Sequence, residues 1–243
     1  MSLDAKKRLI ADYMVCSMAR LLKDGEIVFT GLASHMPVVA IHLARTLYAP
    51  KLWQLNTSGG ICPSKLTTES FSSIGDGMRS GSVGDFPLDE VFDLSMRGGL
   101  DVAFLSGVQF DKNGCINASV IGKYESPKIR LPGGAGSPVL LPTAKRVLAW
   151  RTKHDKRTFV NNVDFVTAKG NLDRVVTNLG VLRFENGGWK LESVHEEVEV
   201  ESVLEHTSFP LDCSDVKQTP QPTQNELRAL KLIDPKKLRY LEF

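Results

Sequence analysis

The chain has 243 residues, of which 42% are hydrophobic and 24% are charged, proportions typical of a soluble globular protein. Its 30 basic and 28 acidic residues are mixed along the chain, with no basic run, so a nucleic-acid partner is not expected. No apolar run approaches the ~20 residues that span a bilayer, and the first segment lacks the pattern of a secretory signal. These features predict a cytoplasmic protein with no membrane partner.

Helices and strands are predicted to alternate over the first hundred residues, from apolar spacing and from glycine and proline at the element ends. The expected elements are a helix over 5–23, a strand over 26–31, a helix over 34–50, a strand over 51–56, a helix over 86–99 and a strand over 101–107. Residues 59–85 are rich in Gly, Ser and Thr, and we interpret them as a long irregular excursion.

The second half of the chain is predicted to be rich in strands. Two turns are expected, at Lys112-Asn113-Gly114 and at Asn186-Gly187, and the second is typical of a β-hairpin. Short helices are expected over 199–209 and 225–233, the latter after a Pro-Thr-Gln linker over 217–224. The fold class predicted is α/β, with an open, mostly parallel sheet flanked by helices and extended by antiparallel strands.

The first candidate site is the most glycine-dense stretch, "PGGAGSP", over 132–138. A dinucleotide-binding interpretation fails, because the spacing is not G-x-G-x-x-G and Pro138 follows in place of a helix. Successive backbone N–H groups in such a loop can still bind an oxyanion or a phosphate. Spacing alone favours a tight turn between two strands.

The second candidate site is "WQLNTSGGICPSK", over 53–65, where a strand ends in a glycine turn with Thr57 and Ser58 at its tip. Such turns commonly carry catalytic groups, yet this one contains no acid and no histidine. It has no G-x-S-x-G elbow either, so a serine hydrolase of that type is not expected. The five histidines and four cysteines are scattered, which predicts neither a metal site nor a disulfide framework.

Several longer motifs point to a family. "YAP" precedes a strand and "SGG" follows it, and further along come "GVQFDKNGCIN", "YESPKIRLPGGAGS", "NNVDFVTAKG" and "VVTNLGVLRFENG". In this order and at these distances the chain resembles the β subunit of family I CoA-transferases, of the glutaconate CoA-transferase type. The resemblance implies a single CoA-transferase-like domain over 1–243 and an α-subunit partner, as an α2β2 assembly. It also implies an acyl-CoA thioester as substrate, with no permanently bound cofactor.

The resemblance assigns roles to the two candidate sites. In the transferases a glutamate on the turn after the second strand attacks the acyl-CoA, giving a mixed anhydride and then a glutamyl-CoA thioester. The loop that lies over the CoA thioester, where N–H groups polarise the carbonyl, matches Gly133, Gly134, Ala135 and Gly136. The resemblance thus reverses the interpretation of this loop as a plain turn. The implied active-site lining positions are Gly31, Gly59, Gln109 and Asn117.

The chain departs from the family at the nucleophile, because it has Thr57-Ser58-Gly59 where the transferases have Glu-Ser-Gly. A threonine or serine hydroxyl would form an ordinary ester, too stable to reverse easily by thiolate attack, and would need a base that this turn lacks. The nearest downstream acid is Glu69, twelve residues further on, in the irregular segment.

Relatives without the glutamate retain CoA-thioester binding. They include a decarboxylase of the glutaconyl-CoA type, with cysteine at this position, and the hydrolase that opens a steroid ring. The tail "PTQNELRALKLIDPKKLR" resembles the β subunit of that hydrolase. The favoured hypothesis is therefore hydrolysis, C–C cleavage or decarboxylation of a CoA thioester. The alternatives are a true transferase of the glutaconate or 3-oxoacid type, with its nucleophile elsewhere, or a non-catalytic partner subunit.

Overall fold

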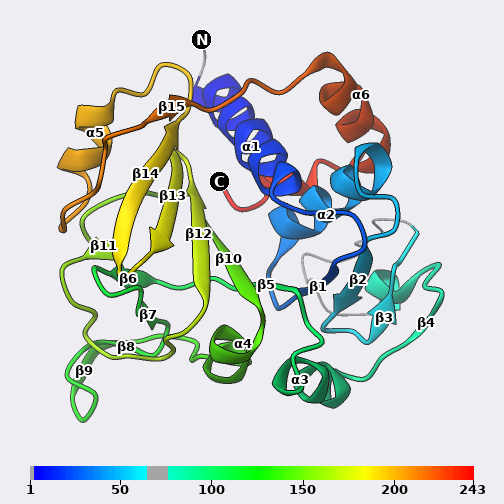
Figure 1. Cartoon of the computed structure of the whole chain (residues 1–243), viewed down its shortest axis with the longest axis horizontal. Helices are drawn as coiled ribbons and strands as arrows, with labels where there is room; N and C mark the ends of the chain where they lie inside the picture. Colours follow the sequence, from blue (N-terminus) through cyan, green and yellow to red (C-terminus); the bar gives the residue numbers. More distant parts are fainter. Residues whose placement is uncertain (1–2, 65–75) are drawn as a thin grey trace. The chain divides into compact units, whose positions relative to one another are not determined.

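The structure is a computed structural model that describes residues 3–64 and 76–243 (Figure 1). The chain divides into two compact units. Unit 1 comprises Met1–Phe104 and Pro220–Phe243, and unit 2 comprises Leu105–Thr219. The predicted single domain over 1–243 stays a prediction, and Glu69 lies outside the described residues.

Unit 1 is built on three parallel strands in the order β5 (Val102–Phe104), β1 (Ile27–Thr30) and β2 (Trp53–Asn56). Two short antiparallel strands, β3 (Gly60–Ile61) and β4 (Gly84–Asp85), extend the sheet beyond β2. Because β1 and β2 are parallel and Thr30 pairs with Asn56, the loops that follow these strands begin side by side. In open α/β sheets this carboxyl edge is where ligands bind.

Helices complete unit 1. They are α1 (Leu3–Arg20), α2 (His35–Leu47), α3 (Leu88–Met96), α6 (Gln224–Ile233) and the 3₁₀ turns η1 (Asp76–Arg79) and η2 (Leu238–Tyr240). The helix α2 is buried along most of its length and packs against α1, α6 and η2. Arg20 of α1 binds Glu226 of α6 through Nε at 2.8 Å and Nη2 at 2.6 Å, which fastens the C-terminal segment to the N-terminal helix.

Unit 2 contains a second run of strands. β10 (Arg146–Arg151) is parallel to β12 (Leu172–Thr177), which is followed by an antiparallel pair, β13 (Gly180–Glu185) and β14 (Gly188–Val194). β15 (Lys217–Gln218), inside the predicted linker, runs parallel to β14. Asn186 and Gly187 both have positive φ, as a two-residue hairpin requires, so the turn predicted there is confirmed.

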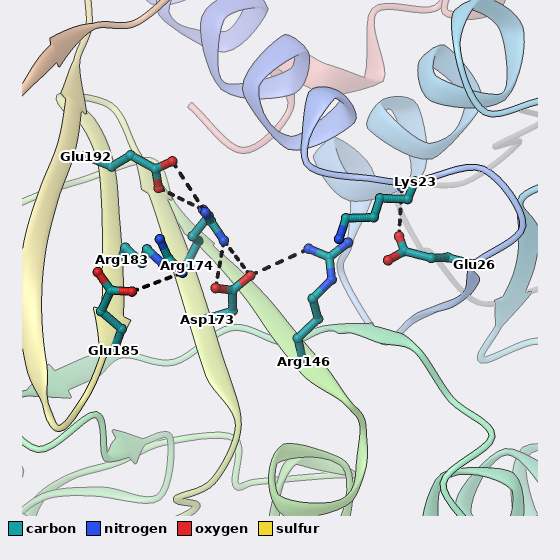
Figure 2. A network of polar contacts seen from close by, with 8 residues as sticks. All are labelled: Lys23, Glu26, Arg146, Asp173, Arg174, Arg183, Glu185 and Glu192. Carbon is teal, nitrogen blue, oxygen red and sulfur yellow. Dashed lines mark hydrogen bonds and ion pairs between the residues drawn. The ribbon is translucent and has the colours of Figure 1, made fainter.

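A network of ion pairs lies on the strands of unit 2 (Figure 2). The Arg174 guanidinium contacts Glu192 at 2.7 Å and Asp173 at 2.7 Å, and Asp173 also receives Arg146 at 3.6 Å. Arg183 pairs with Glu185 at 3.0 Å, and both residues lie on β13. Of these pairs, Arg146–Asp173 joins the adjacent strands β10 and β12, where opposite charges stabilise strand pairing modestly.

Smaller strands and helices surround this run. They are β11 (Phe159–Val160), β6 (Gln109–Asp111) and β7 (Ile116–Asn117) in one sheet, the hairpin β8 (Val120–Gly122) and β9 (Pro127–Arg130), and the helices α4 (Ser137–Thr143) and α5 (Val200–Glu205). β6 and β7 pair around the turn predicted at Lys112-Asn113-Gly114.

The α/β class, with a mostly parallel sheet flanked by helices and extended by antiparallel strands, is confirmed. The prediction that no helix follows the glycine stretch is wrong, because α4 begins at Ser137. Pro138 lies in the first turn of that helix, where its missing N–H has no intrahelical acceptor to lose. The segment 59–85 contains β3, η1 and β4 within its described part. No described helix is long and apolar enough to cross a membrane.

Candidate active site

The turn after β2 is organised by Asn56, whose side chain is 1% exposed. Its Oδ1 accepts hydrogen bonds from the backbone N–H of Ser58 at 2.9 Å and of Gly60 at 3.2 Å, while its Nδ2 donates to the Met78 carbonyl at 2.9 Å. Asparagine readily closes such turns because its short amide mimics the backbone. The single side chain of Asn56 therefore fixes the conformation of residues 57–60.

Thr57 is attached to the end of the neighbouring strand. Both its backbone N–H, at 3.2 Å, and its hydroxyl Oγ1, at 3.0 Å, donate to the carbonyl oxygen of Thr30 on β1. A backbone carbonyl does not take up a proton at neutral pH, so this hydrogen bond orients the hydroxyl without activating it. Thr57 and Ser58 are both half-buried at the carboxyl edge.

Two glycines allow the chain to close this turn. Gly59 has a φ of +85°, a conformation that favours glycine, and its carbonyl accepts from the Phe86 N–H at 2.8 Å. A Cβ on Gly60 would lie 3.2 Å from the Met78 carbonyl oxygen and 2.5 Å from Ser82 Oγ. The turn is thus packed directly against residues 78–82.

The glycine loop lies between β9 and α4, in unit 2. The Gly133 N–H donates to the Ala118 carbonyl at 2.8 Å, and the Gly134 carbonyl accepts from the Ser137 N–H at 2.8 Å. Within the described part of the chain, the N–H groups of the next three residues, Gly134, Ala135 and Gly136, donate to no protein acceptor. Consecutive unpaired N–H groups of this kind bind an anion or a developing oxyanion.

Side chains beneath the loop fix its position. A Cβ on Gly134 would lie 2.6 Å from Thr167 Cγ2 and 3.0 Å from the Pro138 ring, so only glycine fits without a shift of these neighbours. Thr167 Oγ1 accepts from the Ala118 N–H at 2.9 Å and lies 2.6 Å from Ser119 Oγ. Thr167 therefore links its own segment to the residues that hold Gly133.

Gln109 and Asn117 support the same region from inside the unit. The Asn117 Nδ2 donates to Gln109 Oε1 at 2.6 Å and to the Val120 carbonyl at 2.6 Å, and its Oδ1 accepts from the Ser119 N–H at 2.9 Å. Gln109 is 6% exposed and Asn117 is fully buried. Their geometry indicates that they position the residues next to the glycine loop.

The buried histidines pack in the interior of their units. Burial lowers the pKa of His42 on α2 to about 4, and the nearby Arg45 contributes. Burial likewise lowers the pKa of His154 to about 3 and that of His195 to about 4. These two rings bind opposite sides of Thr177, at its hydroxyl (3.1 Å) and at its carbonyl (2.9 Å). All three histidines are therefore neutral at pH 7.

The structure brings the predicted positions together within each unit. Unit 1 places Gly31 directly after Thr30, and hence beside Thr57, Ser58 and Gly59. Unit 2 places Gln109 and Asn117 beside the residues that hold the glycine loop. The sequence analysis missed Asn56 and Thr167. An asparagine at a strand end before a Thr-Ser-Gly turn was a usable signal for the first, whereas nothing local marks the second.

An open α/β protein whose loops gather at the carboxyl ends of parallel strands belongs to a class that binds ligands at that edge. The profile described as Coenzyme A transferase matches residues 13–206. The β subunit of 3-oxoadipate CoA-transferase from Pseudomonas knackmussii is 33% identical over 92% of this chain and 92% of its own length. The β subunit of glutaconate CoA-transferase from Acidaminococcus fermentans is 27% identical over 90% of each chain.

A solved structure agrees with these relatives. The decarboxylase AibA/AibB superposes with a TM-score of 0.88 at 27% identity, covering 95% of this chain and 96% of that one. Crystal structures of this decarboxylase with four different substitutions at one cysteine match almost equally well. The chain belongs to the coenzyme A transferase family, as a subunit of the β type. The resemblance noted from the ordered motifs is confirmed.

Proposed function

We propose that the chain is the β-type half of a heteromeric enzyme that acts on an acyl-CoA thioester without covalent attack from the turn after β2. The reaction is hydrolysis, C–C cleavage or decarboxylation of the thioester. The CoA thioester is the substrate, and no resident cofactor is required. The proposal includes an α-type partner, in an α2β2 assembly, and a location in the cytoplasm.

The observation that carries the proposal is the hydrogen bond from the Thr57 hydroxyl to the Thr30 carbonyl, 3.0 Å long. A nucleophilic hydroxyl needs a base to take its proton. Here the proton points at a peptide carbonyl, which supports a Thr57 that attacks nothing. The decarboxylase AibA/AibB, which superposes on 95% of this chain, supports a reaction other than CoA transfer.

The proposed contribution of the glycine loop is to polarise the thioester carbonyl. Unpaired N–H groups at Gly134, Ala135 and Gly136 would polarise the thioester carbonyl, which stabilises negative charge that develops on its oxygen. Removal of one such donor typically slows an enzyme by about 10²–10³-fold. Hydrolysis, decarboxylation and C–C cleavage beside a thioester all develop charge on this oxygen. The acid or base that completes each reaction would come from the α-type partner.

A CoA-transferase is the second candidate, favoured by the 33% identity to the β subunit of 3-oxoadipate CoA-transferase. Its nucleophile would be Glu69 or a partner residue. A non-catalytic role beside an active α subunit is the third. The transferase differs from the proposed function in whether a covalent intermediate forms on the protein.

Mass spectrometry of the assembled heteromer separates them. The enzyme is incubated with 3-oxoadipyl-CoA and glutaconyl-CoA, and then with borohydride, which reduces a glutamyl-CoA thioester irreversibly. We expect turnover without any adduct on residues 53–65 and without inactivation by borohydride. An acyl or CoA adduct on Thr57 or Ser58 would contradict the proposal, and an adduct on Glu69 would establish the transferase. Thr57→Glu serves as the positive control, since it restores the carboxylate of the family.

The heteromeric assembly has its own test. The chain produced alone should show little acyl-CoA turnover and should self-associate through the surface that the α subunit covers. Co-production with the α-type subunit should give a defined complex in light scattering, with activity. Full turnover by the chain alone would refute the assembly.

A further inference from the structure

The loop that joins β1 to α2, residues 31–34, begins at the carboxyl edge of unit 1, beside the turn that carries Thr57. The Thr30 carbonyl at its start accepts both hydrogen bonds from Thr57. At its end, the Ser34 hydroxyl donates to the Leu32 carbonyl at 3.2 Å and, among the described residues, forms no capping bond to α2. The first turn of α2 contains no acid either. What holds this helix end therefore decides where loop 31–34 lies.

A carboxylate from far along the chain binds the first turn of α2. Glu242 Oε1 accepts from the Met36 N–H at 3.0 Å, across 206 positions of sequence. Met36 is the second residue of α2, where unpaired N–H groups and the helix dipole favour a negative charge. Pro37 has no N–H, and the Val38 N–H already donates to the Ser34 carbonyl at 3.0 Å. Glu242 thus provides the cap that the local sequence lacks.

Buried charges hold the segment that carries Glu242. Arg239 of η2, 6% exposed, binds Asp12 of α1 through Nε at 2.6 Å and Asp234 through Nη1 at 2.7 Å. Its Nη2 donates to the Tyr240 hydroxyl at 2.7 Å, and η2 packs against both α1 and α2. Because separating buried ion pairs is costly, this segment stays docked and holds the half-buried Glu242 at α2.

Loop 31–34 is strained between its two attached ends. Ala33 has a φ of +50°, in the left-handed region that residues other than glycine rarely adopt. Such strain persists only where the surroundings hold the backbone. Leu32 is 51% exposed and gives the middle of the loop little packing. The contacts at its two ends, at the Thr30 carbonyl and at Glu242, therefore carry much of the restraint.

We propose that Glu242 is a positioning residue for the candidate active site. Its carboxylate holds the first turn of α2, keeps loop 31–34 in its strained conformation and so fixes the Thr30 carbonyl that orients Thr57. Glu242 acts through this loop and contacts neither the substrate nor the reacting carbonyl. Its effect on turnover rests on the proposed function, whereas its effect on the backbone does not.

Hydrogen–deuterium exchange of the assembled heteromer tests the effect on the backbone. Glu242→Ala should speed exchange in peptides covering 31–36 and 53–60 by about fivefold, the size expected for loss of one helix cap. Glu242→Gln keeps an acceptor oxygen and should restore most of the protection. The control is Arg20→Gln, which removes the ion pair to Glu226 on α6 and does not touch the first turn of α2. It should lower the free energy of unfolding and leave exchange in both peptides unchanged.

Turnover of 3-oxoadipyl-CoA and glutaconyl-CoA tests the effect on the site. Glu242→Ala should lower kcat by about fivefold and change KM little, and the loss should not add to that of Thr57→Ala, because both act through the Thr30 carbonyl. Formate should restore part of kcat in Glu242→Ala, since a small carboxylate can bind the vacated N–H group. Formate should have no such effect on Arg20→Gln.

Three outcomes are decisive. Equal exchange in Glu242→Ala and wild type, or an equal rise in Arg20→Gln, would overturn the positioning role and leave the proposed function intact. A fall in kcat that adds fully to that of Thr57→Ala and does not respond to formate would also overturn it, and would assign Glu242 to folding alone. A wild-type heteromer that turns over no acyl-CoA would refute the proposed function, while the exchange measurement would still decide the role of Glu242.

Discussion

The turn after β2 and the glycine loop are both built on a buried asparagine, yet they leave different groups unpaired. The Asn56 side chain closes its turn through three hydrogen bonds. In the same turn, the Thr57 hydroxyl and N–H both donate to the Thr30 carbonyl. Asn117 fixes only the residues beside the glycine loop, and three successive N–H groups stay unpaired among the described residues. Under the proposed function, this chain contributes hydrogen-bond donors to catalysis and no nucleophile.

Gly134→Val should have the largest effect. A Cβ at this position meets Thr167 Cγ2 and the Pro138 ring, so the loop must shift and its N–H groups lose their alignment. We expect the affinity of the heteromer for CoA thioesters to fall by about 100-fold, since several donors move together. Titration calorimetry measures the change, and circular dichroism establishes that the variant is folded.

Two further substitutions test whether the loss of binding in Gly134→Val comes from the clash with Thr167 and not from a general loss of folding. Gly134→Ala should weaken binding less than Gly134→Val does. Thr167→Ser, added to Gly134→Val, should restore part of the lost affinity, because serine lacks the methyl group but keeps the hydroxyl that accepts from the Ala118 N–H. Unchanged CoA-thioester affinity in a folded Gly134→Val variant would favour a plain turn.

Asn56→Ala and Asn117→Ala test whether the two regions depend equally on their asparagines. Each variant loses at least three hydrogen bonds of a buried amide, so the free energy of unfolding should fall by about 3 kcal/mol. Urea denaturation measures this difference. Asn113→Ala, at an exposed turn position, should change it by less than about 0.5 kcal/mol. An Asn56→Ala variant as stable as the wild type would contradict the conclusion that Asn56 holds the turn after β2.

Acid should destabilise the protein through its buried histidines. His154 and His195 in unit 2, and His42 in unit 1, have folded-state pKa values of about 3, 4 and 4, below the ordinary value near 6.5. The unfolded chain therefore binds more protons between these values, and the stabilisation present above pH 6.5 is lost as the pH falls toward 4. A group like His195 contributes a loss of about 2 kcal/mol at pH 5.

Denaturation curves between pH 7 and pH 4.5 measure this loss. His195→Gln should flatten the dependence of the unfolding free energy on pH, and His42→Gln should flatten it by a similar amount. A wild-type free energy of unfolding that stays constant over this range would contradict the buried neutral state of these rings.

Thr57→Ala should have the smallest effect. Loss of one hydrogen bond to the Thr30 carbonyl costs about 1 kcal/mol, which corresponds to roughly fivefold in turnover by the heteromer. Removal of a nucleophile would instead cost many orders of magnitude. Thr57→Ser keeps the hydroxyl and should retain nearly full activity. A fall in turnover of more than about 10⁴-fold in Thr57→Ala would instead indicate that Thr57 is a nucleophile.

Most of the order of helices and strands, apart from α4, β15 and the short elements within 59–85, was determined by the sequence alone. Apolar periodicity and turn residues suffice there because they act on neighbouring positions. The 34–50 pattern gave α2 at His35–Leu47, and Asn186-Gly187 gave the β13–β14 hairpin, since its backbone conformation depends on those two residues. The family also followed from the sequence, through six motifs in a fixed order. The helix predicted over 5–23 ends at Arg20, a boundary that local pattern does not fix closely.

The chemistry of the two candidate sites was decided by tertiary structure. The state of the Thr57 hydroxyl depends on the β1–β2 register, which brings a carbonyl from 27 residues away to its oxygen. The requirement for glycine at 134 depends on Thr167, which reaches the loop only when two separate segments pack together. Such contacts join residues far apart in the chain, and no local pattern encodes them, because hydrogen-bond partners are selected by the packing of whole elements.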